Sequence, residues 1–258
     1  PGRGYGGGGD TGLAYLQSLL STRAGGVYDF TDPTTMYNDT SGTTLVSAGT
    51  PDVARVDDLS GNGNYLRQFS TYSGFTYDYT DGALARPVNQ KEVLLYAPEI
   101  NGNTGLTNFI ICEISNFNDS IQSSAFRYVG LGGSYIDGNT SGRIHFGPSP
   151  DDTIRCDGAF IQLNSGFNVV SKGLRTFRRV SGQGDARYDG VSNTPLRSPG
   201  SALNATADDI YVGQGTDTSA LEWPQVDYYA LFVATGTFTT EEIENIEAAL
   251  AEMVGYTY

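Results

Sequence analysis

The sequence predicts an all-β fold, a sandwich or jelly roll, with a short helix near the N-terminus and a helix at the C-terminus. Five of the nine glutamates, which favour helices, fall within residues 241–252, whereas the aspartates are scattered among Gly, Asn, Ser and Thr. Between the ends, short apolar segments alternate with clusters rich in Gly, Asn and Asp, as in a sandwich. We find no repeat of about 20–50 residues that would indicate a propeller or solenoid.

The N-terminal segment predicts an arm followed by a helix. Residues 1–9 are mostly glycine, which is typical of a flexible leader and also allows an arm to lie along a neighbouring subunit. Four leucines at helical spacing predict a short helix: Leu13, Leu16, Leu19 and Leu20. We therefore divide the chain into an arm with a short helix, residues 1–24, and one sandwich domain, residues 25–258.

Six central segments are predicted strands, because they are short, rich in β-branched or aromatic residues and bounded by turn clusters. They are residues 107–114, 125–131, 143–146, 173–180, 209–212 and 227–234. Cys112 lies in the first of them, where we expect a buried free thiol, and a disulfide is the alternative for Cys112 and Cys156. His145, the only histidine, lies in the third and is expected to be structural.

The C-terminal helix has the clearest local pattern. Thr239 and Glu242, three residues apart, form a candidate capping box, and Gly255 is a plausible stop. Five apolar residues between them share one helical face: Ile243, Ile246, Leu250, Met253 and Val254. The glutamates of this helix are expected to face its N-terminal dipole and solvent.

Several segments, in order, resemble bacteriophage virion proteins that carry a concanavalin A-like, or laminin-G-like, jelly roll. The opening is formed by Gly26-Val-Tyr-Asp-Phe-Thr-Asp-Pro-Thr-Thr-Met-Tyr37, by residues 39–44 and 57–64, and by Ala85-Arg86-Pro87. The later half is similar to that fold's hairpin pair, following strand, closing strand and terminal helix: residues 177–180 with 186–191, 209–213, 228–233 and 239–256. The resemblance covers residues 25–258 and implies two antiparallel sheets packed face to face, one curved into a concave surface.

The composition argues against several activities. A net charge of −14 does not favour nucleic acid, and no apolar run approaches the roughly 20 residues of a membrane helix. Glucanases of this superfamily use a Glu-x-Asp-x-Glu strand, which the sequence lacks. Glu113 is the one glutamate in a predicted strand and Glu222 adjoins Trp223, and neither has a paired acid. We therefore expect that the protein is not an enzyme.

One loop is a candidate calcium site. Asp58, Ser60 and Asn62 offer alternating oxygen ligands before Gly63, which partly matches a calcium loop. Residue 69 is Phe where such a loop carries a bidentate Glu, so capping of turns by these side chains is the alternative. We expect no other cofactor.

Two sets of aromatic residues are candidates for glycan binding. Phe75, Tyr77 and Tyr79 alternate, which would place three rings on one strand face, and Trp223 lies on a loop before the last strand. A place in the core or in a subunit interface is the alternative for both sets, because aromatic residues concentrate there as well.

Four arginines form the only basic concentration in this acidic chain: Arg175, Arg178, Arg179 and Arg187. On a strand, Arg175 and Arg179 share a face with Phe177, whereas Arg178 points the other way. Because arginine pairs well with carboxylates, we expect a contact with an acidic neighbouring subunit, and the alternative is pairing inside the chain.

The resemblance implies a structural role. We expect a tailed-phage virion protein displayed on the outer capsid surface as a decoration or cement protein. Its partners would be the major capsid protein and copies of itself, a trimer being a common arrangement. The alternative is a glycan-binding module, in a phage receptor-binding protein or a secreted lectin, that recognises a host surface glycan. Neither nucleic acid nor a membrane is an expected partner.

Overall fold

The protein is described here from a computed structural model. It describes residues 11–68, 74–85, 95–97, 100, 108–117, 129–132, 143–146, 153–156, 159–162, 171–180, 183–192, 209–213 and 226–258. For residues 117, 130–132, 143–146, 153–156, 159–162, 183, 209 and 211 only the backbone is described.

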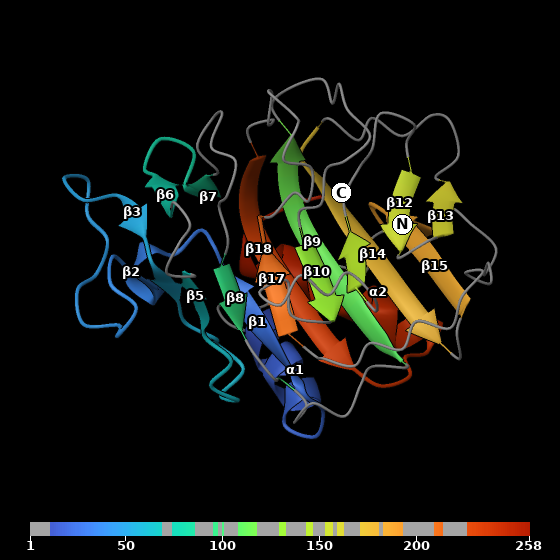
Figure 1. The fold of residues 1–258 in the computed structure, drawn as a ribbon. Helices are drawn as coiled ribbons and strands as arrows, with labels where there is room; N and C mark the ends of the chain where they lie inside the picture. Colours follow the sequence, from blue (N-terminus) through green and yellow to red (C-terminus); the bar gives the residue numbers. More distant parts are fainter. Residues whose placement is uncertain are drawn as a thin grey trace.

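Two antiparallel sheets make up most of the described chain (Figure 1). Sheet A contains β1 (Gly25–Asp29), β3 (Asp52–Val53), β6 (Phe75–Asp78), β7 (Ala83–Ala85), β9 (Phe109–Phe117), β14 (Gly173–Val180), β15 (Gln183–Tyr188), β16 (Val191–Ser192) and β18 (Val226–Thr235). Sheet B contains β2 (Met36–Tyr37), β4 (Arg55–Val56), β5 (Leu66–Gln68), β8 (Leu95–Ala97), β10 (Val129–Gly132), β11 (Arg143–Phe146), β12 (Thr153–Cys156), β13 (Ala159–Gln162) and β17 (Asp209–Val212). The prediction of an all-β fold is confirmed at this level.

The first and last strands of the chain, β1 and β18, pair with each other near the middle of sheet A. Its order is β16-β15-β14-β9-β18-β7-β6-β3, with β1 also paired to β18, and sheet B runs β13-β12-β11-β10-β17-β8-β5-β4-β2. Strands β11, β14 and β17 have the predicted bounds. Asp189 and Gly190 have φ of 44° and 75° and form the two-residue turn between β15 and β16, as this dipeptide predicts.

A core of aromatic and aliphatic side chains joins the two sheets. Phe75, Phe177 and Leu231 of sheet A and Leu66 and Ile210 of sheet B belong to one buried cluster. Burial of this apolar area is the main force that holds the sheets face to face.

The helices cover the other face of sheet A. Helices α1 (Thr11–Leu20) and α2 (Thr240–Met253) pack on each other and, through Leu16 and Ile246, share a second buried cluster with Phe232 of sheet A (Figure 1). The predicted capping box is present: Glu242 N–H donates to Thr239 Oγ1, and Thr239 N–H donates to Glu242 Oε2. Within the described residues, no helix has the length and apolar character to cross a membrane. A 3₁₀ helix, η1 (Pro33–Thr35), precedes β2.

Cys112 is a buried free thiol, as predicted. Its sulfur lies 3.3 Å from Thr176 Oγ1 on the helix-covered face of sheet A, and burial raises its pKa well above the ordinary value. The side chain of Cys156 lies outside the described part of the chain.

Candidate functional site

One line of cross-strand partners crosses most of sheet B. Each member is directly opposite the next on the neighbouring strand, and we call this line the sheet B row: Tyr37, Arg55, Arg67, Tyr96, Tyr211, Gly130 and His145. Directly opposed residues of antiparallel strands share a face. Val56, Leu66 and Leu95, which alternate with the row, are buried in the core, so the described side chains of the row lie on the face away from sheet A.

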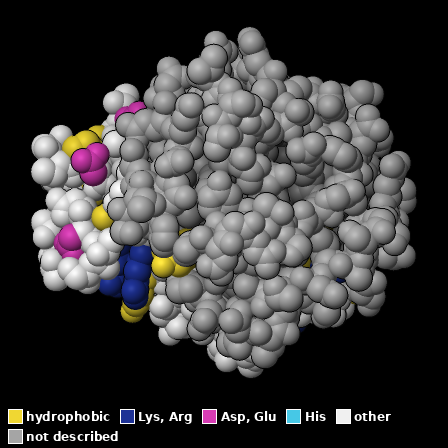
Figure 2. Space-filling view, viewed as in Figure 1, with side chains coloured by type: hydrophobic (Ala, Val, Ile, Leu, Met, Phe, Trp, Pro, Cys, Tyr) yellow, Lys and Arg dark blue, Asp and Glu magenta, His cyan; other side chains and the backbone are white. Residues whose placement is uncertain are grey.

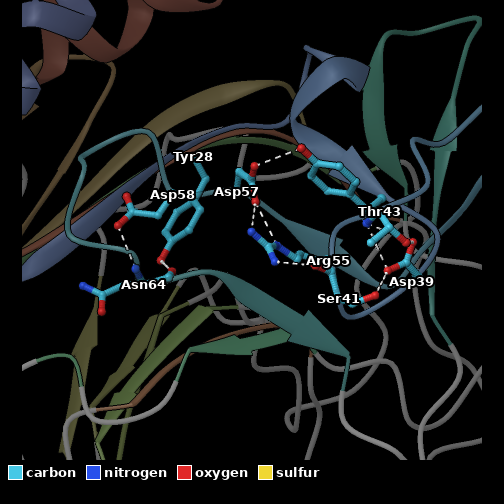
Figure 3. A network of polar contacts seen from close by, with 9 residues as sticks. Tyr28, Asp39, Ser41, Thr43, Arg55, Asp57, Asp58 and Asn64 are labelled. Carbon is cyan, nitrogen blue, oxygen red and sulfur yellow. Dashed lines mark hydrogen bonds and ion pairs between the residues drawn. The ribbon is translucent and has the colours of Figure 1, made fainter.

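Arg55 is held rigidly at one end of the row (Figure 3). Its Nε donates to Asp57 Oδ1 at 2.8 Å and its Nη1 donates to the carbonyl of Ser41 at 3.1 Å. Its guanidinium carbon lies 3.8 Å from the centre of the Tyr65 ring and 5.5 Å from that of Tyr37. The guanidinium is therefore a fixed support for two tyrosine rings.

Tyr37 completes this network. Its hydroxyl donates to Asp57 Oδ2 at 3.1 Å. Desolvation, and then the charge of Asp57, raises the pKa of Tyr37, so the phenol stays protonated and remains a donor at neutral pH.

The loop of residues 39–44 supports Arg55 from the side. Asp39 accepts hydrogen bonds from Ser41 Oγ, Thr43 and Thr44, and these hold the pKa of Asp39 well below its ordinary value. Gly42 has a φ of 74°, and a Cβ there would lie 2.6 Å from Arg55 Nη1. A glycine is therefore needed for the loop to reach the guanidinium.

Arg67 differs from Arg55 because its charge is not neutralised by a neighbour. Among the arginine and lysine side chains that the structure describes, it is the only exposed one, and it has no carboxylate partner in that part of the chain. Its guanidinium lies 5.7 Å from the centre of the Tyr65 ring, and it is directly opposite the half-buried Tyr96. Figure 2 shows Lys or Arg side chains beside hydrophobic ones at the lower left, the side on which β4 and β5 lie.

A second polar cluster lies between the sheets. Glu113 is fully buried on the core face of β9, and burial raises its pKa to about 7, while the charge of Arg175 opposes the rise. Ser115 Oγ donates to Glu113 Oε1 at 3.2 Å and accepts from Arg175 Nη1 at 2.8 Å. Glu113 Oε2 has no hydrogen-bond partner in the part of the chain that the structure describes. Its cross-strand neighbours are Arg175 and Leu231.

The three arginines predicted to contact another subunit are used inside the chain. Arg175 and Arg179 share the inner face with Phe177, as predicted, but each is only 3% exposed. Arg178 points to the helix side, where it pairs with Asp185 through two nitrogens and donates to the Phe238 carbonyl. The expectation of a subunit contact is corrected for Arg175 and Arg179, because their buried side chains have no surface to offer a partner, and Arg178 follows the alternative of pairing inside the chain.

The proposed aromatic platform is also corrected. Phe75 and Tyr77 are buried in the core between the sheets, and the Tyr77 hydroxyl donates to the Thr31 carbonyl at 2.7 Å. β6 ends at Asp78, so Tyr79 follows the strand and is 44% exposed. Burial of apolar area explains why the first two rings face inward. Trp223 lies outside the described residues.

The candidate calcium loop has the geometry of a capped turn. Asp58 Oδ1 accepts from the N–H groups of Val27 and Ser60 at 3.1 and 2.9 Å. Asp58 Oδ2 accepts from Ser60 Oγ at 2.6 Å. It also accepts from Asn64 N–H at 3.0 Å (Figure 3). Asn62 uses its side-chain amide to donate to the carbonyls of Leu20, Arg23 and Gly25. Among the described residues, no group of three or more acidic, His or Cys side chains converges as a metal site would require.

We expect Asp58→Ala to lower the free energy of unfolding by about 2–4 kcal/mol, because it leaves the buried N–H of Val27 and the part-buried N–H groups of Ser60 and Asn64 without an acceptor. Urea unfolding measures this loss, and Asp52→Ala, at an exposed aspartate on β3, is the control with an expected change below about 0.5 kcal/mol. A rise in the melting temperature with added calcium that Asp58→Ala abolishes would contradict the assignment as a cap.

The row was missed because only its local pattern is visible in the sequence. Leu95-Tyr96-Ala97 and Ile210-Tyr211-Val212 each place a tyrosine between two apolar residues, which indicates an outward position on a strand. Nothing local to these triplets tells which strands pair or in which register.

Comparisons with known proteins give a fold and no family. No family model matches the chain, and no curated protein matches it in sequence. A GH54 α-L-arabinofuranosidase soaked with a cyclic sulfate inhibitor matches in structure with a TM-score of 0.61 and 13% identity, over 95% of this chain and 66% of that one. A mutant of Trypanosoma rangeli sialidase displaying trans-sialidase activity matches with a TM-score of 0.54 and 9% identity, over 93% of this chain and 34% of that one.

A third match is an arabinofuranosidase complexed with arabinofuranosyl-α-1,2-xylobiose, with a TM-score of 0.57 and 14% identity, over 95% of this chain and 65% of that one. This chain therefore spans about a third of the sialidase and just under two thirds of the arabinofuranosidases. At these identities the likeness shows the fold.

The expectation that the protein is not an enzyme is corrected by these matches. It depended on the missing Glu-x-Asp-x-Glu strand, yet the three solved chains named above, whose matches each cover more than nine tenths of this one, are a sialidase mutant and two arabinofuranosidases. The absence of one family's carboxylate motif does not exclude catalysis on a fold that other glycosidases share.

Proposed function

We propose that the protein recognises carbohydrate and that the sugar binds along the sheet B row. The row itself carries this proposal: Tyr37 and Tyr96 lie with two arginines on the face of sheet B that the core does not occupy, and the Tyr65 ring packs on Arg55. The matches to sialidase and arabinofuranosidase structures support it, because the fold is one that carbohydrate-active proteins use.

The chemistry of the row suits a sugar. The C–H faces of a pyranose or furanose pack on tyrosine rings, and phenol and guanidinium donors reach its hydroxyl groups. Because Arg55 supports the Tyr65 ring from one side at 3.8 Å, that ring loses little freedom when a ligand stacks on it.

We also propose a specific type of sandwich and a place for the protein on a phage particle. The two sheets would form a concanavalin A-like jelly roll, with sheet B as the ligand-binding layer. Display of this layer on a tailed-phage particle stays a prediction. A count of this chain in purified particles against the major shell protein tests it, because decoration requires comparable numbers.

Tyr96→Ala is expected to weaken binding to a retained polysaccharide about tenfold, or about 1.4 kcal/mol, because one stacking ring is lost. Affinity electrophoresis through gels that contain single polysaccharides measures this change. Tyr79→Ala is the matched control, since Tyr79 is an exposed tyrosine that follows β6 of sheet A. The binding face is wrong if Tyr79→Ala abolishes retention while Tyr96→Ala leaves it intact.

A further inference from the structure

We infer that the sugar bound by the sheet B row carries a carboxylate, as uronic and sialic acids do, and that Arg67 is the residue that recognises it. This inference rests on the proposed function, because it names the ligand class of the same face. The two arginines of the row, Arg55 and Arg67, differ in their partners and in their exposure.

Arg55 is already paired with a carboxylate of this chain, and its side chain is only 14% exposed. Its Nε and Nη2 both contact Asp57 Oδ1, at 2.8 and 2.7 Å, and its Nη1 donates to the Ser41 carbonyl. Its positive charge is neutralised by Asp57, so it contributes position and stacking.

Arg67 lies directly opposite Arg55 and has the complementary properties. It is exposed, it has no carboxylate or carbonyl partner among the described residues, and its contact there is with the Tyr65 ring at 5.7 Å. A guanidinium presents two parallel N–H groups that match the two oxygens of a carboxylate. The tyrosines on either side, Tyr65 and Tyr96, place a stacked sugar next to this fork.

An exposed arginine without a carboxylate partner is unusual in a chain with this excess of acidic side chains. With 29 acidic and 15 basic side chains, the chain has internal carboxylates in excess, and every other described arginine or lysine side chain is at least half-buried. A net charge of −14 also opposes general attraction of polyanions. Selectivity for an acidic sugar therefore has to come from local pairing at Arg67 together with ring stacking.

The test compares acidic polysaccharides with their own neutral forms. The full chain is run through gels that contain polygalacturonate or polysialic acid, and through gels that contain the same polymers after reduction of their carboxyl groups. Poly-glutamate serves as a polyanion without sugar rings. We expect at least about tenfold stronger retention by one acidic polymer than by its reduced form, and no retention by poly-glutamate.

Variants of Arg67 distinguish bidentate pairing by its guanidinium from an effect of positive charge alone. Arg67→Ala is expected to remove the preference for the acidic form, and Arg67→Lys to keep only part of it, because lysine cannot pair in a bidentate way. Arg23→Gln is the control, since Arg23 pairs with Glu242 at the helices. Thermal unfolding checks that Arg67→Ala stays folded, as an exposed substitution should.

The outcomes are distinguishable. Equal retention by an acidic polymer and its reduced form, or an unchanged preference in Arg67→Ala, overturns the inference and leaves carbohydrate binding standing. Retention by poly-glutamate equal to that by the acidic polymers also overturns it, because the sugar would then play no part. Retention by no polymer of the panel overturns the proposed function together with the inference.

Discussion

Arg187→Ala is expected to lower the free energy of unfolding by about 3–5 kcal/mol, because it leaves a carboxylate buried without its partner. Arg187 Nε donates to Glu247 Oε1 at 2.8 Å and Nη2 donates to Oε2 at 3.1 Å, which ties β15 to α2. Glu247 is only 1% exposed, so water cannot replace the guanidinium. Urea unfolding at pH 7 measures the loss.

The control for this variant is Glu244→Ala. Glu244 also lies near Arg187, at 3.7 Å, but its side chain is 59% exposed, so the expected change is below about 0.5 kcal/mol. Burial raises the pKa of Glu247, although Arg187 opposes the rise. The cost of Arg187→Ala should therefore shrink as the pH falls and Glu247 becomes protonated. A loss below about 1 kcal/mol at pH 7 would show that the pair does not hold the helix.

Glu113→Gln is expected to stabilise the protein above pH 7 by about 3 kcal/mol. The pKa of Glu113 in the folded chain, about 7, lies above its ordinary value of 4.5, so the folded state favours the protonated carboxyl. The wild-type chain is then most favoured below pH 4.5 and loses stability as the pH rises towards and through 7. A difference of about 2.5 pKa units corresponds to about 3 kcal/mol.

The measurement is the difference in unfolding free energy between wild type and Glu113→Gln, followed from pH 4 to pH 8. The difference should grow across this window, since glutamine stays neutral throughout. Glu241→Gln, in the exposed first turn of α2, is the control for loss of one negative charge from the surface. A difference that stays constant with pH would contradict the raised pKa, because it would mean that Glu113 has the same pKa in the folded and the unfolded chain.

Local patterns predicted the elements well. The capping box at Thr239 and the Asp189-Gly190 turn involve residues within three positions of each other, so their energies are visible in the sequence. The prediction that Arg178 lies on the opposite face of its strand from Arg175 and Arg179 is also based on a local pattern, and it is confirmed.

What each side chain does on its face was decided by the tertiary structure. The sequence placed the glutamates of the last helix towards solvent, yet Glu247 is buried because α2 packs on sheet A and meets Arg187 there. Phe75 and Tyr77 share one face of their strand, as their alternation predicts, but this face is buried in the core between the sheets. In both cases the partner lies far away along the chain.

The sequence by itself determined the all-β class, the positions of six strands (β9, β10, β11, β14, β17 and β18), and a helix at each end, because these follow from periodicity, turn chemistry and caps. The sheet B row was decided only by the tertiary structure. Tyr37 and its partner Arg55 are 18 residues apart in the sequence. The pairings of Arg67 with Tyr96 and of Tyr96 with Tyr211 join strands that are much farther apart along the chain. Such register is set by how two whole sheets bury their apolar faces, which no local segment of this sequence encodes.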